Sequence, residues 1–580
     1  MTAPMKRCPK CNRAESDGSL AFCRADGTRL VSDGSFVSEG AGTLRFDSAS
    51  VTGETETRIL PTGEGLSRPT APTTLLDGGR ASGHTQDLSK PQSRKGLLIA
   101  VAAMIAVTVA ASAYLYLSRV KTGAAKNSIA VLPFQNAGGD PNTEYLSDGI
   151  SESLINSLSQ LPNVRVLARS TMFRFKGKDA DPQAVGKQLG VETILTGKVV
   201  QVGDSLNVQA DLVNVSDGSQ LWGERYTRRA SDVLAVQEDI AREIVGTLRP
   251  KLSGEQREQV TKRYTDNAEA YQLYLKGRFY WNKRTGEGFN QAIDYFRQAI
   301  EKDPNYALAY AGLADCYVLR PGRQNLELSK AKEAAAHALA IDPKLAEAHT
   351  SLAFAKTLSD RDWDGARAEF EEAIRLNPKY ATAHQWYAIL LSVLGRPDEA
   401  LAEINRAIEF DPLSLIINTD KGRILYYARR YDEAIRQLQD TLKMDADFGM
   451  AHNILGWCYA EKGMYDQAVA EMRKSMELGV SVGGALGRIG YAYARAGRRD
   501  EAQKVLAQLE QRSEQSYISP YTLATIYAAL GERDKAFSLL QKAIDEGAAG
   551  QSFMKVDPVF DNLHPDPRFA DLMRRVGLPQ

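Results

Sequence analysis

The residues with the clearest potential for chemistry lie at the start of the chain. Three of the five cysteines occur within the first 23 residues, as Cys8-x2-Cys11 followed by Cys23. A tight C-x2-C turn is a typical half of a structural zinc site, which needs four ligands in a tetrahedron. An x2 step from Cys23 reaches an aspartate instead of a cysteine. The pattern predicts a zinc site, or a degenerate motif without metal, with the ligands Cys8, Cys11, Cys23 and Asp26.

Residues 1–30 make up the head that would hold this metal. The run FCRADGTRL resembles the second half of short zinc-ribbon modules in bacterial membrane proteins. A catalytic role is not expected, because no histidine precedes His84 and the segment is too small for a substrate pocket. Residues 31–95 are nearly half Ser, Thr, Gly and Pro, and this composition predicts a disordered tether.

An apolar stretch follows the tether. Residues 97–117 read LLIAVAAMIAVTVAASAYLYL and contain no charged side chain. As a helix this stretch would span roughly 30 Å, the hydrocarbon thickness of a bilayer. We therefore expect a transmembrane helix over 96–118 and a single-pass protein of the bacterial inner membrane. Flanking Lys and Arg residues balance each other, whereas a thiolate zinc site favours a reducing compartment, so the N-terminus is expected in the cytoplasm and the C-terminal domains outside it.

Residues 128–250 have the pattern of a compact α/β domain. SIAVLPF and VRVLARS are strand-like runs around a helical segment, and three further strand-like runs lead to an amphipathic helix. IAVLPFQN, EYLSDGISESLINSLSQLPNVRVLARS, LGVETILTGKV and LWGERYTR resemble, in this order, the TolB-amino-terminal-like domain. The resemblance implies a module that precedes tetratricopeptide arrays in bacterial membrane proteins, including CadC-like regulators and some receptor-type kinases.

No feature of this domain predicts an enzyme. Gly197-Lys198 invites comparison with a P-loop, but Glu192 replaces the first glycine and Val199 replaces the Ser or Thr that the motif requires. The domain contains no histidine and no cysteine. The chain has 72 basic and 72 acidic residues, which argues against a broad nucleic-acid footprint. We expect no catalytic residue, no small-molecule substrate and no nucleic-acid partner.

A 34-residue period dominates residues 267–546. Small residues recur with it at Ala366, Ala400, Ala434, Ala468, Ala502 and Ala536. Asp-Pro or Asn-Pro pairs close four of the helices, and glycines mark the turn within three later units. This is the tetratricopeptide (TPR) pattern, in which paired helices meet at small residues. We expect about eight units in an all-α superhelical solenoid, closed by a capping segment over 547–580.

The first helix of each unit should line the concave face of this solenoid. His349, His384 and His452 recur near the repeat spacing, but units of a solenoid are too far apart for one metal ion to bridge, so we expect packing roles. Aromatic and arginine side chains are enriched in binding hot spots. Either a partner-binding groove or ordinary packing between repeats could use Arg423, Tyr426, Tyr427, Asn453, Trp457, Tyr491 and Arg495.

Together these patterns describe a multidomain chain: a zinc-ribbon-like head, one transmembrane helix, an α/β domain and a TPR solenoid. The function expected first is a membrane-anchored scaffold or adaptor that binds a protein or peptide, in signalling or in envelope assembly. The alternative is a membrane-integrated regulator or sensor of the CadC-like type without a DNA-binding domain, because residues 1–95 do not supply a winged helix.

The metal site leads to a direct prediction. The peptide 1–30 should bind about one zinc ion, more weakly than a four-cysteine site does, because a carboxylate is a harder ligand than a thiolate. Zinc content is measured in the wild-type peptide and in a variant with all three cysteines changed to serine. Equal zinc content in the two peptides would refute the site.

Overall fold

The computed structural model divides the chain into two compact units, Met1–Arg94 and Lys95–Gln580. It describes residues 6–7, 14–15, 31–32 and 128–578, apart from 162, 179–180, 249–259, 261, 321–323, 360 and 549. In the first unit, the strands β1 (Lys6–Arg7), β2 (Ala14–Glu15) and β3 (Val31–Ser32) form an antiparallel sheet in the order β2-β1-β3. The predicted zinc ligands Cys8, Cys11, Cys23 and Asp26 lie outside the described residues, as does the rest of the tether.

The membrane-spanning architecture predicted from the sequence requires correction. Across the described residues, no helix combines the length and the apolar character that a bilayer crossing demands. The longest of these helices, α10 (Gln324–Ile341), has 18 residues and carries charged side chains such as Glu327 and Lys330, whereas a membrane span needs about 20 mostly apolar residues. The segment 97–117 itself lies outside the described residues. The fold class with a transmembrane helix and the inner-membrane location, with its assigned orientation, are therefore not retained.

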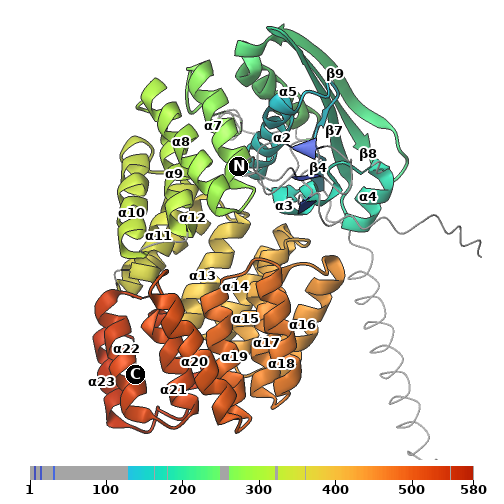
Figure 1. The fold of residues 1–580 in the computed structure, drawn as a ribbon. Helices are drawn as coiled ribbons and strands as arrows, with labels where there is room; N and C mark the ends of the chain where they lie inside the picture. The colour runs from blue at the N-terminus through green and yellow to red at the C-terminus, as the bar shows by residue number, and fades with distance from the viewer. Residues whose placement is uncertain are drawn as a thin grey trace, which may run out of the picture. The chain divides into compact units, whose positions relative to one another are not determined.

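An α/β domain opens the second unit (Figure 1). Its six-stranded sheet has the order β6-β4-β7-β8-β9, and β5 also pairs with β7. The strand β4 runs parallel to β6 and β7, and β7, β8 and β9 form an antiparallel meander. The strands are β4 (Ser128–Val131), β5 (Gln135–Asn136), β6 (Arg165–Val166), β7 (Thr193–Val202), β8 (Ser205–Asn214) and β9 (Gln220–Arg229), and the helices are α2 (Glu144–Ser159), α3 (Arg169–Met172), α4 (Pro182–Leu189) and α5 (Val233–Leu248).

The burial of each strand follows from its place in the sheet. All four residues of β4 are buried, as expected for a strand flanked by two parallel neighbours. In contrast β8 alternates, and its inward residues Leu206, Val208 and Leu212 are fully buried. The helix α4 starts where the Asp181 carboxylate accepts hydrogen bonds from two backbone N–H groups, and it ends at Gly190 with a φ of 63°. The expected α/β domain is present.

A helical array follows and confirms the tetratricopeptide prediction. Within the described residues, consecutive helices pack as eight pairs, from α7·α8 to α21·α22. The helices are α7 (Ala268–Trp281), α8 (Gly286–Lys302), α9 (Ala307–Leu319), α10 (Gln324–Ile341), α11 (Ala346–Ser359), α12 (Trp363–Leu376), α13 (Ala381–Val393), α14 (Pro397–Phe410), α15 (Leu415–Tyr427), α16 (Tyr431–Met444), α17 (Gly449–Glu461), α18 (Tyr465–Glu477), α19 (Val482–Arg495), α20 (Arg499–Ser513), α21 (Pro520–Ala529) and α22 (Arg533–Glu546). The recurring alanines, such as Ala366 and Ala434, are fully buried, because a larger side chain would separate the paired helices.

Three histidines at equivalent positions of their units connect the first helix of the unit to the second through a hydrogen bond. Each Nδ1 lies 2.5–2.7 Å from a glutamate of the second helix, in the pairs His349–Glu369, His384–Glu403 and His452–Glu471. Each Nε2 lies 2.9 Å from a backbone carbonyl in the loop before the first helix. Both ring nitrogens are therefore occupied within the unit, and no group of residues suited to hold a metal ion occurs in the part of the chain that the structure describes.

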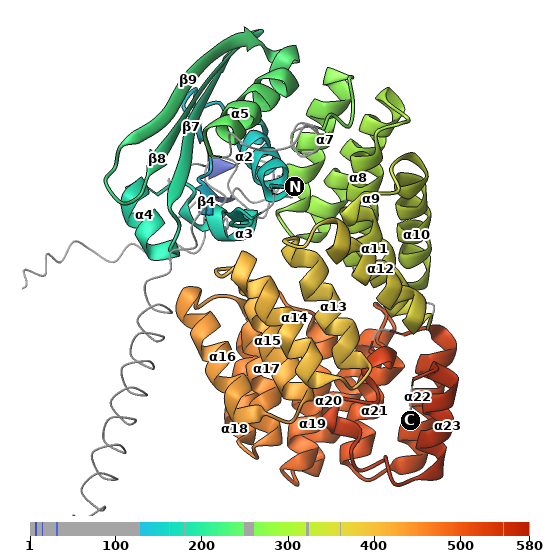
Figure 2. The same cartoon turned by 180° about the vertical axis from the view of Figure 1, so that it is seen from behind.

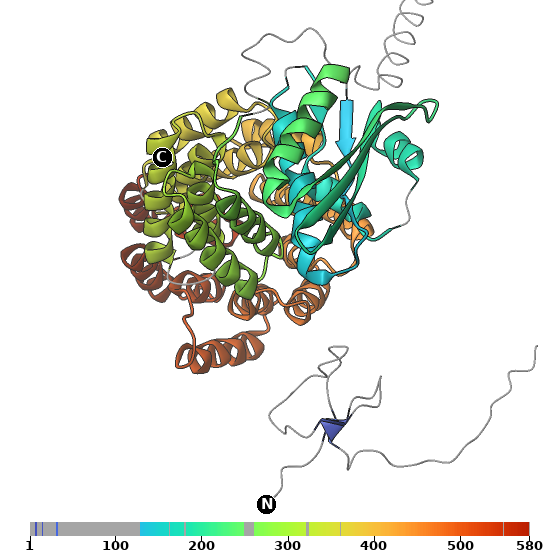
Figure 3. The same cartoon turned by 90° about the horizontal axis from the view of Figure 1, so that it is seen from above.

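Buried charges join the α/β domain to the first repeat. Seen from the front, from behind and from above, α2 and α5 lie between the sheet and α7 (Figures 1, 2 and 3). The Glu152 carboxylate on α2 accepts from Arg278 Nε on α7 at 2.7 Å and pairs with Arg169 Nε at 2.8 Å. Arg278 also pairs with Asp315 on α9 at 3.3 Å. A second junction lies farther along the array, where Asp411 after α14 accepts from the backbone N–H of Thr171 at 3.0 Å.

Replacement of Arg278 by alanine should destabilise the second unit strongly. Glu152 and Asp315 would lose a common partner inside the protein, and removal of one member of a buried ion pair costs about 3–5 kcal/mol. The matched control is Arg367→Ala, since Arg367 pairs with Asp364 on the surface and should contribute less than about 1 kcal/mol. Denaturant unfolding measures the free energy of unfolding of the two variants. If both variants lose a similar amount, Arg278 does not stabilise the junction between the α/β domain and the array.

Candidate functional site

The seven groove residues predicted from the sequence all lie on the first helices of consecutive units. The structure does not bring them together on one open surface. Tyr426 on α15 is fully buried and Tyr491 on α19 is 2% exposed. Tyr427 and Asn453 are also buried, and Trp457 on α17 packs against Tyr426 with ring centres 5.6 Å apart. Arg495 packs against the Tyr491 ring.

The chain's own C-terminal segment covers this part of the face. The 3-10 turns η5 (Gln551–Phe553) and η6 (Pro558–Phe560) lead to the last helix, α23 (Pro567–Val576). Between the two turns, the Asp557 carboxylate is fully buried and pairs with Arg488 on α19. It also accepts from the hydroxyl of Tyr521 on α21 at 2.7 Å and lies 3.3 Å from the hydroxyl of Tyr426. Although burial lowers the pKa of Arg488, the Asp557 carboxylate raises that pKa well above its ordinary value.

Aromatic and backbone contacts extend this cover. The ring of Phe553 stacks on Tyr427 with centres 5.2 Å apart, and Arg429 donates to the carbonyl of Val556. Near the middle of the array, the hydroxyl of Ser552 lies 3.4 Å from the Thr357 carbonyl at the end of α11. The segment after α22 therefore fills the concave side of units that are far from it in the sequence.

An open groove remains on the N-terminal side of this cover. It has a volume of about 210 Å³ and is lined by first helices of five consecutive units, α9, α11, α13, α15 and α17. The rings of Phe354 and Trp386 stack at 4.4 Å and form its apolar floor. Ile416 projects from α15 with 40% exposure, which is high for a large apolar side chain. Of the seven predicted residues, Arg423 alone is among those that line this groove.

A polar chain of contacts forms one side of the groove. Gln385 Nε2 donates to Asp420 at 2.6 Å, and the Asp420 carboxylate pairs with Arg423 at 2.8 Å. The Arg423 side chain keeps 26% exposure, and its guanidinium lies 5.8 Å from the ring of Phe553. Arg423 therefore stands at the boundary between the open groove and the C-terminal cover.

The spacing of the repeats could have predicted this groove from the sequence. Arg423, Trp457 and Tyr491 occupy one register at steps of 34 residues. Toward the N-terminus, one step of 34 residues leads from Arg423 to Ile389, and a further step of 35 residues leads to Phe354. Both of these residues line the open groove. Toward the C-terminus the same register reaches Trp457 and Tyr491, where the chain covers itself.

Comparison with protein-family models confirms the repeats. Tetratricopeptide models match residues 357–416, 419–476 and 485–516. This chain contains a TPR array. A further model, described as the second domain of HilA/YgeH-like transcriptional regulators, matches residues 125–243, which include most of the α/β domain. The TolB-amino-terminal-like resemblance stays a prediction.

Relatives of the chain include two proteins with assigned names. A Rhizobium meliloti protein named "Putative adenylate cyclase 3" is 33% identical over 285 residues, which cover 48% of this chain and 42% of that protein. The transcriptional regulator HilA of Salmonella typhimurium is 25% identical over 292 residues, covering 49% of this chain and 51% of HilA. The chain thus spans about half the length of the curated relatives it matches.

Solved TPR structures are also similar to parts of the chain. The peptide-binding TPR protein YrrB covers 33% of this chain with 95% of its own length, at 23% identity and a TM-score of 0.24. PilF of Pseudomonas aeruginosa covers 40% of this chain with 97% of its own length, at 19% identity and a TM-score of 0.30.

The C-terminal cover should depend on its buried carboxylate. Asp557→Ala leaves the Arg488 guanidinium buried without its partner, and we expect the free energy of unfolding to fall by about 3–5 kcal/mol. Asp571→Ala is the control, because Asp571 and its partner Arg574 are both about 60% exposed. Denaturant unfolding measures both variants. If Asp557→Ala is no less stable than Asp571→Ala, the segment does not hold the array closed through this pair.

Proposed function

We propose that this chain is a protein-interaction scaffold whose open groove, between α9 and α17, binds an extended segment of a partner protein. The TPR fold supports protein or peptide binding as a general role. The observation that carries the finer proposal is the exposed Ile416 beside the stacked Phe354 and Trp386, an apolar surface that the C-terminal cover leaves open.

The chemistry of the groove indicates the kind of segment that would fit. An aromatic floor suits an apolar anchor residue, since buried aromatic and apolar contacts supply most of the energy at an interface. The Gln385–Asp420–Arg423 chain supplies polar groups that can orient the partner's backbone or an acidic side chain. The preferred partner is therefore a peptide with a large apolar residue next to a hydrogen-bonding or acidic one.

We further propose that the chain acts by binding and not by catalysis. Buried acids and bases such as the Glu152–Arg278 pair are engaged with one another and serve the folding of the second unit. The name of the Rhizobium meliloti relative concerns a protein of which this chain matches less than half. The zinc site at Cys8, Cys11, Cys23 and Asp26 remains part of the proposal, as a structural element of the head.

A second candidate function is that of a regulatory adaptor. The match of residues 125–243 to the second domain of HilA/YgeH-like regulators favours it. In that case the groove would bind a protein that takes part in transcriptional regulation. Identification of the captured partner separates the two candidates, because a scaffold in assembly and an adaptor in regulation bind different classes of protein.

The groove can be tested with one pair of matched variants. Ile416→Asp places a charge among apolar groove residues, and we expect partner affinity to fall at least about tenfold, or about 1.4 kcal/mol. Ile341→Asp is the control, because Ile341 has a similar exposure of 38% but lies on α10, a second helix. Partners are first identified by crosslinking to the full chain. Each partner is then purified, and its affinity for the two variants is measured.

The thermal midpoints of both variants are measured beside the affinities. Both residues are exposed, so we expect midpoints close to that of the wild type. If Ile416→Asp and Ile341→Asp bind the partner equally well, the groove is not the binding site.

A further inference from the structure

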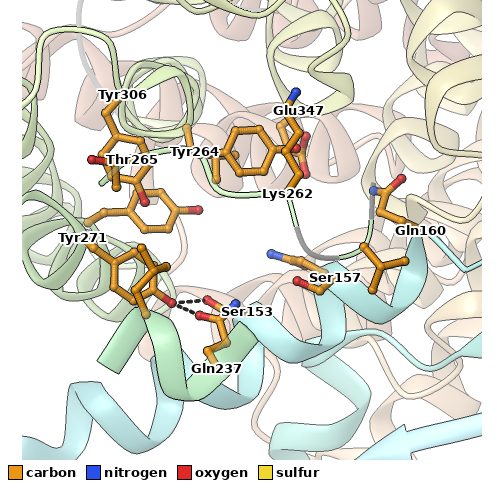
Figure 4. Close-up of a pocket in the computed structure, with 15 residues that line it drawn as sticks. Ser153, Ser157, Gln160, Gln237, Lys262, Tyr264, Thr265, Tyr271, Tyr306 and Glu347 are labelled. Carbon is orange, nitrogen blue, oxygen red and sulfur yellow. Dashed lines mark hydrogen bonds between the residues drawn. The ribbon is translucent and has the colours of Figure 1, made fainter. Parts of the chain in front are cut away.

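A second, smaller pocket lies where the α/β domain meets the first repeats. It has a volume of about 80 Å³ (Figure 4). From the α/β domain, α2 contributes Ser153 and Ser157, and α5 contributes Gln237. The opposite wall consists of tyrosines from the array and of Glu347 on α11. Neither the groove proposed above nor the C-terminal cover shares a residue with this pocket.

Aromatic rings make up much of the wall. Tyr274 packs against Tyr306 with ring centres 5.2 Å apart and against Tyr271 at 6.5 Å. A fourth ring, Tyr264, already attracts a cation, since Lys262 Nζ lies 4.9 Å from its centre. The faces of aromatic rings carry partial negative charge, so a wall of this kind favours cations over anions.

Of the two charged groups at the pocket, one has an ion-pair partner within the part of the chain that the structure describes and the other does not. Lys262 pairs with Asp342 at 2.7 Å, and the Tyr271 hydroxyl donates to Gln237. The Glu347 carboxylate, by contrast, has no ion-pair partner among the described residues, and burial raises its pKa. A carboxylate drawn out of water without a cation is costly, and a ligand that supplied the cation would relieve this cost.

We propose that this pocket binds a primary alkylammonium group, with the ammonium at Glu347 and its alkyl chain against the tyrosine rings. The group would come from a free polyamine or from a lysine side chain of a partner. A cavity of about 80 Å³ is far smaller than the pockets that hold drug-sized ligands and suits a compact head group. The serine, glutamine and tyrosine hydrogen-bonding groups add acceptors for the ammonium protons.

The site is tested by titration calorimetry on the full chain. The probes are 1,4-diaminobutane, its neutral analogue 1,4-butanediol, and N-acetyl-lysine methylamide as a model of a peptide lysine. We expect the diamine or the lysine amide to bind at least tenfold more tightly than the diol. Binding of the diamine alone identifies a free amine as the ligand, and binding of the lysine amide identifies a partner's side chain.

Variants locate the binding. Glu347→Gln removes the charge at nearly constant size and should weaken amine binding at least tenfold, whereas Glu301→Gln, on an exposed position of α8, should not change it. Ser157→Trp leaves Glu347 in place and fills the pocket from α2, so it decides the question if Glu347→Gln fails to fold. The proposal is overturned if no amine binds the wild type, or if a folded Glu347→Gln or Ser157→Trp variant binds as the wild type does.

Discussion

Each helix pair of a TPR array has an apolar face that only a neighbouring element can cover. This constraint explains most of the architecture of the second unit. At the N-terminal end, α2 and α5 of the α/β domain pack on α7. At the other end, α23 packs on α22, and the turns before it run back along the concave side as far as Thr357. Neither end of the array is left as a bare repeat.

The cover at the C-terminal end closes one part of the array and leaves another part open. In the units from α15 to α21, the concave positions hold Tyr426, Arg488 and Tyr521, and the Asp557 carboxylate engages all three. In the units from α11 to α13, Phe354 and Ile389 hold the register of Arg423, and no segment of the described chain fills the groove above them. The repeats are alike in fold but differ in what covers them, and this open groove lies in the middle of the array.

The sequence predicts the parts of this structure that depend on local or periodic signals. The 34-residue spacing of Ala366, Ala400 and Ala434 reveals the helix pairs, because their contact needs a small residue at a fixed position in each unit. The strand and turn patterns reveal the α/β domain in the same way. The covered state of Tyr426 could not be predicted, since Asp557 lies 131 residues away and no periodic signal links the two. Trp457 and Arg423 were equally good candidates for the groove by residue type, although only Arg423 borders the open groove.

The junctions of the α/β domain bear directly on the shape of that groove. Glu152 holds α7 through Arg278, while the backbone of Thr171 holds the loop after α14 through Asp411. Phe354 and Trp386 belong to helices between these two anchor points in the sequence, α11 and α13. Buried charged and hydrogen-bonded pairs tolerate little displacement, because each partner loses its compensation as the distance grows. The α/β domain therefore contacts the array at two places, one on each side in the sequence of the helices that carry the aromatic rings of the groove.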